Sequence, residues 1–157
     1  MRQQWRRWLR GPKHGLARKS IVYGVPRHPG PEHLHALLGQ YKSLQEWGRL
    51  QGFDLDPVPE DLAALDEAID RFIEEDGRHR QMSAVESEAG PFLGTVIVST
   101  IHGAHWRLWP NGHPVVRLAS GRDLDVIALA DDRLRSGQPR LATVYADAAT
   151  TDPDNQT

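Results

Sequence analysis

The 157-residue sequence contains no cysteine. That absence excludes a disulfide framework, thiol catalysis and cysteine-ligated zinc or iron–sulfur clusters. No apolar run approaches the roughly 18 residues that a membrane-spanning helix needs. The basic start of the chain has no apolar stretch behind it and no small-residue cleavage signal, so we expect no secretory signal peptide and predict a cytoplasmic location.

Two common catalytic loops are also missing from the sequence. The segments GPFLG and PNGHP lack the lysine and the glycine spacing of a phosphate-binding loop. No serine lies in the G-x-S-x-G context of a nucleophile elbow. These absences argue against a kinase, an NTPase or an α/β-hydrolase, and we predict no cofactor.

Acidic residues are absent from the first 31 positions, which carry eight arginines or lysines. The remainder of the chain carries eleven bases against all 21 acids. We call residues 1–19 the basic leader. The acidic remainder is not expected to attract nucleic acid by its overall field.

Helical periodicity dominates the first half of the chain after an extended or strand-like segment, SIVYGV, at 20–25. Pro31 suits a first helical position, and a continuous apolar stripe predicts a helix to residue 50. The stripe comprises Leu34, Leu37, Leu38, Tyr41, Leu44, Trp47 and Leu50. A second helix is predicted from Pro59 to Ile73, packed on the first as a hairpin.

Turn signals divide the second half of the chain. Residues 105–109 and 114–118 are strand-like and flank Asn111-Gly112, which predicts a two-residue hairpin turn with Trp106 opposite Arg117. Both faces of the sheet would then be mixed in character. Ser120-Gly121 predicts a second turn, residues 122–126 a third strand, and Asp125 the cap of a helix running toward residue 135.

The order of elements predicts an α+β fold. We expect a helical hairpin and a buried helix packed on a three-stranded antiparallel meander, followed by C-terminal helices, one of them around 141–145. The predicted organisation is the basic leader (1–19), a single domain (20–146) and a disordered tail (147–157).

The segment LGTVIVSTIHGAHWRLWPNGHPVVRLASGRDLDV carries a resemblance. Together with LQEWGRLQGFDLDPVPEDLAALDEAID it resembles a family of small proteins from high-G+C bacteria known only as a domain of unknown function. The likeness covers most of residues 20–146. It implies that the LG-containing segment is a helix, so we predict a helix over 91–101 although pattern alone leaves helix and strand open. It implies no catalytic or ligand residues.

Three of the eight histidines fall within a dozen residues, and an aspartate follows on a neighbouring predicted strand. Neutral imidazoles with a carboxylate suit zinc, iron or nickel. The spacing matches no recognised ligand motif, and polar side chains are ordinary at such turns. The candidate metal ligands are His102, His105, His113 and Asp123.

Asp123 and Asp125 alternate along a strand and could share acid and base duties. Helix capping by Asp125 is the favoured interpretation, because caps are far commoner than carboxylate dyads.

Aromatic and cationic residues interleave along the meander. They could form a surface that stacks on a ligand or grips an anion, or the tryptophans could fill the core with arginines covering their edges. The candidate binding residues are Trp106, Arg107, Trp109, His113 and Arg117.

The basic leader combines charge with aromatic residues in WRRWLR. It could contact an anionic membrane surface or a phosphate backbone, dock on the protein's own acidic body, or be inert. The candidate contact residues are Trp5, Arg6, Arg7, Trp8 and Arg10.

The sequence therefore favours a non-enzymatic protein-interaction domain with an unknown protein partner. One alternative is a small metal-binding protein or metal-dependent hydrolase that uses the histidine cluster. A second is a membrane or nucleic-acid contact made by the leader.

Overall fold

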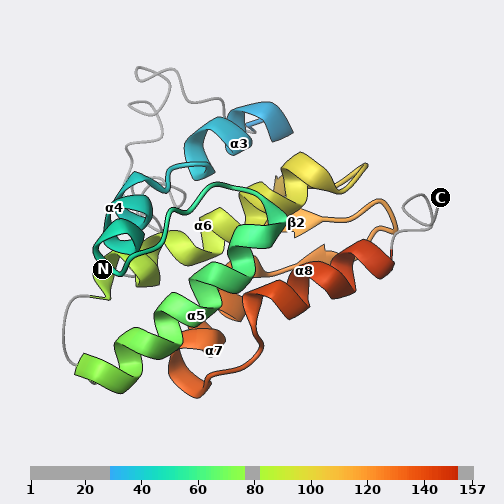
Figure 1. Cartoon of the computed structure of the whole chain (residues 1–157). Helices are drawn as coiled ribbons and strands as arrows, with labels where there is room; N and C mark the ends of the chain where they lie inside the picture. Colours follow the sequence, from blue (N-terminus) through green and yellow to red (C-terminus); the bar gives the residue numbers. More distant parts are fainter. Residues whose placement is uncertain (1–28, 77–81, 152–157) are drawn as a thin grey trace, which may run out of the picture.

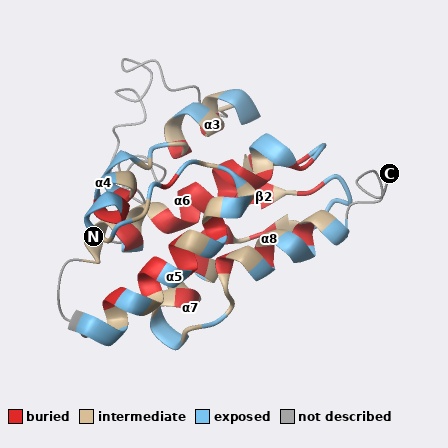
Figure 2. Ribbon diagram, viewed as in Figure 1, coloured by how far each residue is buried: buried red, intermediate tan, exposed pale blue. Residues whose placement is uncertain are grey.

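A long central helix organises the fold of the computed structural model, which describes residues 29–76 and 82–151. This helix, α6 (Ser83–Thr100), contains the segment whose pattern fitted both helix and strand, and the helix prediction for 91–101 is confirmed as far as residue 100. Every residue from Ala89 to Ile97 is buried. Figures 1 and 2 show α6 running through the middle of the molecule with other elements around it. Burial of the branched side chains therefore overrides their weak helix propensity.

The helix predicted from Pro31 to Leu50 is interrupted, and in this respect the prediction is wrong. The chain forms α3 (Pro31–Leu38) and α4 (Lys42–Leu50), separated by residues 39–41. Its apolar stripe continues across the break, because Leu34, Leu38, Leu44 and Trp47 are all buried. At the break, the backbone N–H of Leu44 donates to the Glu88 carboxylate of α6, at 2.6 Å. A partner 44 residues away thus stabilises a helix start that periodicity alone could not reveal.

The second predicted helix is confirmed as α5 (Pro59–Asp76). It meets α4 through an edge-on contact between Trp47 and Phe72, whose ring centroids lie 5.7 Å apart. Its main packing partner, however, is α8 (Leu141–Thr150), with α6 next. Figure 1 shows α5 and α8 side by side across one side of α6. The contact between α4 and α5 in the expected helical hairpin is therefore minor, and most of the α5 packing is with α8 and α6.

The C-terminal helices follow the predicted signals. The side chain of Asp125 accepts a hydrogen bond from the Ala128 backbone N–H, at 3.1 Å, at the start of α7 (Val126–Ser136). Asp125 is therefore a helix cap, as favoured above. The last described helix, α8, continues to Thr150, beyond the predicted domain end at residue 146.

The three strands form an antiparallel sheet in the order β1-β2-β3, with β1 (His105–Leu108), β2 (Pro114–Arg117) and β3 (Asp123–Leu124). The prediction of a two-residue turn at Asn111-Gly112 is wrong. The Trp109 backbone N–H donates to the His113 carbonyl at 2.9 Å, which leaves a three-residue loop, 110–112. Gly112 closes this loop with φ +81°, the left-handed conformation typical of the last residue of such loops.

The longer loop shifts the register by one residue, so that Trp106 pairs with Val116 and not with Arg117. The predicted mixed character of both faces is accordingly wrong. Trp106, Val116 and Leu124 share a buried inner face. The polar residues of the strands share the outer face. They are His105, Arg107, Arg117 and Asp123, all intermediate in exposure.

The described chain therefore has an α+β fold of six helices and a three-stranded antiparallel meander. Among the described residues, none of the helices combines the length and hydropathy that a membrane span requires. The 20–25 segment, the basic leader and residues 152–157 of the predicted tail lie outside the described residues.

Candidate interaction surface

Trp109 and Arg117 are joined through one carboxylate on the outer face of the sheet. The Trp109 indole N–H donates to Asp123 Oδ2 at 2.9 Å. The Arg117 guanidinium donates to both oxygens of Asp123, at 2.8 and 3.1 Å. This forked pairing with Arg117 is the main cause of a lowered pKa at Asp123, and it raises the pKa of Arg117 in turn. Asp123 is therefore a charged anchor for an aromatic ring and a cation.

The indole of Trp109 crosses the sheet to reach this anchor. Trp109 follows β1 and Asp123 lies on β3, so their hydrogen bond passes over β2, which lies between them. On the outer side of β2, Val115 is fully buried although it does not belong to the main core. The hydrogen bond to Asp123 therefore fixes the position of the indole.

His113 is held beside this ring by a second carboxylate. Its Nε2 lies 2.8 Å from Asp125 Oδ1, the same oxygen that caps α7. The rings of His113 and Trp109 lie 5.5 Å apart at 37°. The first loop of the meander is thus tied to the start of α7, and the imidazole has little freedom to move.

Among the five predicted binding residues, Trp106 is buried, and Arg107 differs from Arg117 in having no ion-pair partner among the described residues. Trp106 has no exposed surface, and its indole packs on Gly94 of α6, so its assignment as a surface residue is wrong. Arg107 is half-buried and forms no salt bridge within the part of the chain that the structure describes. It lies near enough to Asp123 to help lower the pKa of that carboxyl. We use the name hairpin face for the four remaining candidates, Arg107, Trp109, His113 and Arg117.

The structure does not gather the four predicted metal ligands. Asp123 is paired with Arg117 and Trp109, and His113 is paired with Asp125. His102 is exposed, and the Nδ1 of His105 lies 3.1 Å from the Gly103 carbonyl. Across residues 29–76 and 82–151, no three histidine or acidic side chains are placed to hold a metal ion together. His105, His113 and Asp123 therefore act as local hydrogen-bonding groups of the meander.

An ion-pair network that the sequence analysis missed joins α5, α7 and α8. Arg133 is 1% exposed and donates to Asp66, which has no exposed side-chain surface, at 2.8 Å. Asp66 also accepts the backbone N–H groups of Leu141 and Ala142 at the start of α8. The sequence did contain a signal for this buried pair, because Arg133 lies on the apolar stripe of α7 and Asp66 lies among the apolar positions of α5. Burial of this kind indicates a structural role.

Asp70 completes that network at its more exposed end. It accepts hydrogen bonds from Arg133 at 2.6 Å and from Arg140 at 2.9 Å. Burial opposes ionisation of Asp70, but the two guanidinium groups outweigh it and lower the pKa of the carboxyl. All its strong partners belong to the same domain, so the network stabilises the packing of three helices.

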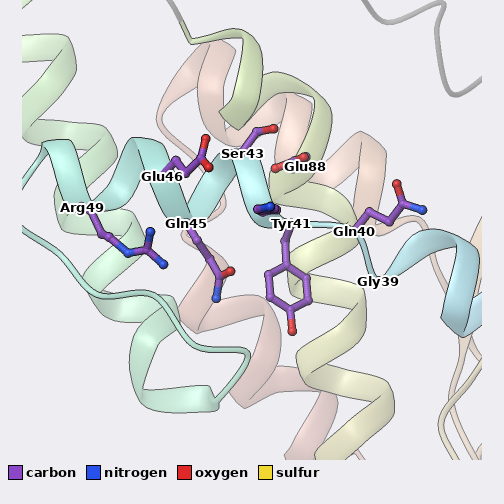
Figure 3. Close-up of a pocket in the computed structure, with 9 residues that line it drawn as sticks. Gly39, Gln40, Tyr41, Ser43, Gln45, Glu46, Arg49 and Glu88 are labelled. Atoms are coloured by element: carbon purple, nitrogen blue, oxygen red, sulfur yellow. The ribbon is translucent and has the colours of Figure 1, made fainter.

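A cleft of about 600 Å³ lies beside the start of α4 and is lined by polar side chains. Figure 3 shows Glu88 next to Ser43 at one side of this cleft, with Tyr41, Gln45 and Arg49 further along. Burial raises the pKa of Glu88, and a hydrogen bond from the Leu44 backbone opposes that shift. The positive end of α4 is therefore already occupied by a carboxylate of the protein itself.

The comparisons with known proteins support a family and a fold. A family model described as a family of unknown function (DUF6278) matches residues 4–151. Among curated proteins, none is significantly similar to this chain. The chain is similar to a crystal structure of a protein from Bacteroides thetaiotaomicron, with 22% sequence identity and a TM-score of 0.53. The match covers 73% of this chain and 42% of that one, so this chain spans less than half of that protein's length.

Proposed function

This chain belongs to the family of unknown function DUF6278, and we propose that it acts as a non-enzymatic protein-interaction domain that contacts a partner protein through the hairpin face. The observation that carries the proposal is the attachment of Trp109 and Arg117 to the same carboxylate, Asp123. Tryptophan and arginine are the residue types most enriched among the strong contacts of protein interfaces.

Pre-organisation supports the proposal energetically. Ordering a long side chain on binding costs about 0.5–1.5 kcal/mol. In the hairpin face, hydrogen bonds within the domain already restrict Trp109, His113 and Arg117. A partner that docks there loses less affinity to the ordering of side chains than it would at a surface of mobile residues.

Site-specific photo-crosslinking tests this function in cells of the source organism. The photoreactive residue benzoylphenylalanine replaces the exposed Pro110, at the tip of the loop beside Trp109. A matched control places it at the exposed Ala63 on α5, far along the chain from the meander. We expect a discrete protein adduct from position 110 and none of that mass from position 63. An equal adduct pattern at both positions, or none at 110, would contradict the proposal.

The leader remains a separate hypothesis. Trp5, Arg6, Arg7, Trp8 and Arg10 lie outside the described residues, and membrane or nucleic-acid contact through them stays a prediction from the sequence. Deletion of residues 1–19 should abolish retention on anionic liposomes or DNA at low salt if that contact exists.

A further inference from the structure

We propose that the hairpin face recognises an acidic segment of the partner protein, one that also presents an apolar side chain to Trp109. This inference rests on the proposed function and names the chemistry of the partner. It is carried by the placement of Arg107 and Trp109 on a meander, residues 105–124, in which three arginines outnumber one carboxylate.

Most of the meander lies in a stretch of the chain without carboxylates, and Asp123 of β3 is its one acidic residue. Residues 89–122 contain no aspartate or glutamate, although the chain after residue 31 holds all 21 acids. The same stretch contains three histidines and three arginines. The arginines are Arg107, Arg117 and Arg122. Residues 105–124 of the meander thus carry three arginines against one carboxylate.

Two of the three arginines of the meander already have a carboxylate partner within the domain. Arg117 is paired with Asp123 at 2.8 Å, and Arg122 lies 3.7 Å from Asp147. Arg107 pairs with Val115 across the sheet and makes no salt bridge with any described residue. Its guanidinium is therefore the group on this face with the most capacity to receive a carboxylate from outside.

Trp109 adds an apolar contact next to that cation. Its single donor, the indole N–H, is used by Asp123, so the ring can offer a partner only its face and edge. An apolar or aromatic side chain suits such a surface, as edge-on and offset ring contacts are each favourable. A segment that alternates acidic and apolar residues would satisfy both Arg107 and Trp109.

The negative charge of the whole body does not prevent this recognition. At physiological ionic strength, charges farther apart than about 8 Å are largely screened. The local field at the meander is therefore set by its own arginines and their close partners.

Binding of a defined probe to the full chain tests the inference. The probe is a short fluorescein-labelled peptide of aspartate, glutamate and phenylalanine, followed by fluorescence anisotropy at low salt. We expect saturable binding that weakens as salt is added, and Arg107→Glu should weaken it about tenfold. Arg135→Glu is the matched control, since Arg135 is an exposed arginine of α7 paired with Asp132, and it should bind as the wild type does.

Several results would overturn the inference. These results are failure of the peptide to bind at low salt, equal binding to Arg107→Glu and to the wild type, and displacement of the peptide by a single-stranded oligonucleotide that binds more tightly. Arg107→Gln repeats the test without charge reversal, and matching thermal melts show that the variants are folded. Crosslinking at position 110 does not require an acidic partner. A crosslink at position 110 without peptide binding would therefore contradict this inference and leave the proposed function standing.

Discussion

Gly94 of α6 lies directly against the indole of Trp106, so that a Cβ atom at Gly94 would come within 2.2 Å of Trp106 Cη2. No pair of real atoms of this kind approaches so closely. The absence of a side chain at Gly94 lets β1 seat its tryptophan on the central helix. This contact joins the helical and sheet parts of the fold, and the first prediction follows from it.

Gly94→Ala should destabilise the protein by about 2 kcal/mol, because overpacking of a core costs about 1–3 kcal/mol and outweighs the gain of about 1 kcal/mol in helix propensity. Urea unfolding measures the change. In a Trp106→Phe background the smaller ring leaves room, so the same substitution should cost much less there. Equal costs in both backgrounds would show that the contact is not the cause.

Arg133→Met should lower the free energy of unfolding by about 3–5 kcal/mol, because it leaves the buried Asp66 carboxylate without its cation. Chemical denaturation at neutral pH gives the value. Arg135→Met, two residues along the same helix and exposed, should change stability by no more than about 0.5 kcal/mol. Similar losses in the two variants would refute a special role for the buried network.

Asp123 should couple the position of Trp109 to acid pH. Its pKa is lowered in the folded state, mainly by Arg117, so its stabilising contribution is complete above the ordinary aspartate pKa and is lost as the pH falls through the folded value. The Trp109 indole N–H resonance, followed by NMR, should therefore shift only at pH values below the ordinary aspartate range. Asp123→Asn should abolish this titration, and a midpoint at or above the ordinary value would count against the assignment.

Glu88 should have the opposite dependence on pH. Burial raises its pKa, so the folded state retains the proton at pH values where the unfolded state has lost it, and stability falls as the pH rises between the two pKa values. Relative to Glu88→Gln, which cannot ionise, the wild type should become progressively less stable across that window. Thermal melts of both proteins over a pH series test this. A difference that grows in the other direction would mean that the bond to Leu44 dominates the ionised state.

Glu88→Ala provides a second measurement at the same position. It removes the acceptor at the start of α4, and loss of a helix cap costs about 0.5–2 kcal/mol. We expect this loss even where Glu88 is protonated, since a protonated carboxyl still accepts a hydrogen bond. The comparison separates the capping role of Glu88 from the effect of its charge.

The candidate site was only partly predictable from the sequence. Trp109, His113 and Arg117 were singled out by composition, and they do lie together on the meander. Trp106 was grouped with them because aromatic and cationic residues interleave along the meander, and a core position was the other interpretation. The loop has one more residue than predicted, so Trp106 pairs with Val116, and the burial of both residues shows that Trp106 belongs to the core.

What the sequence determined by itself was local. The absence of cysteine, the start of α5 at Pro59, the Asp125 cap and the glycine turns are each specified within a few residues, where backbone preference and capping chemistry act directly. Tertiary structure alone decided the break between α3 and α4, the pairing of Arg133 with Asp66 and the assembly of Trp109, Arg117 and Asp123. These features depend on long-range hydrogen bonds and on register, which take effect only when distant segments have been brought together by burial of the core.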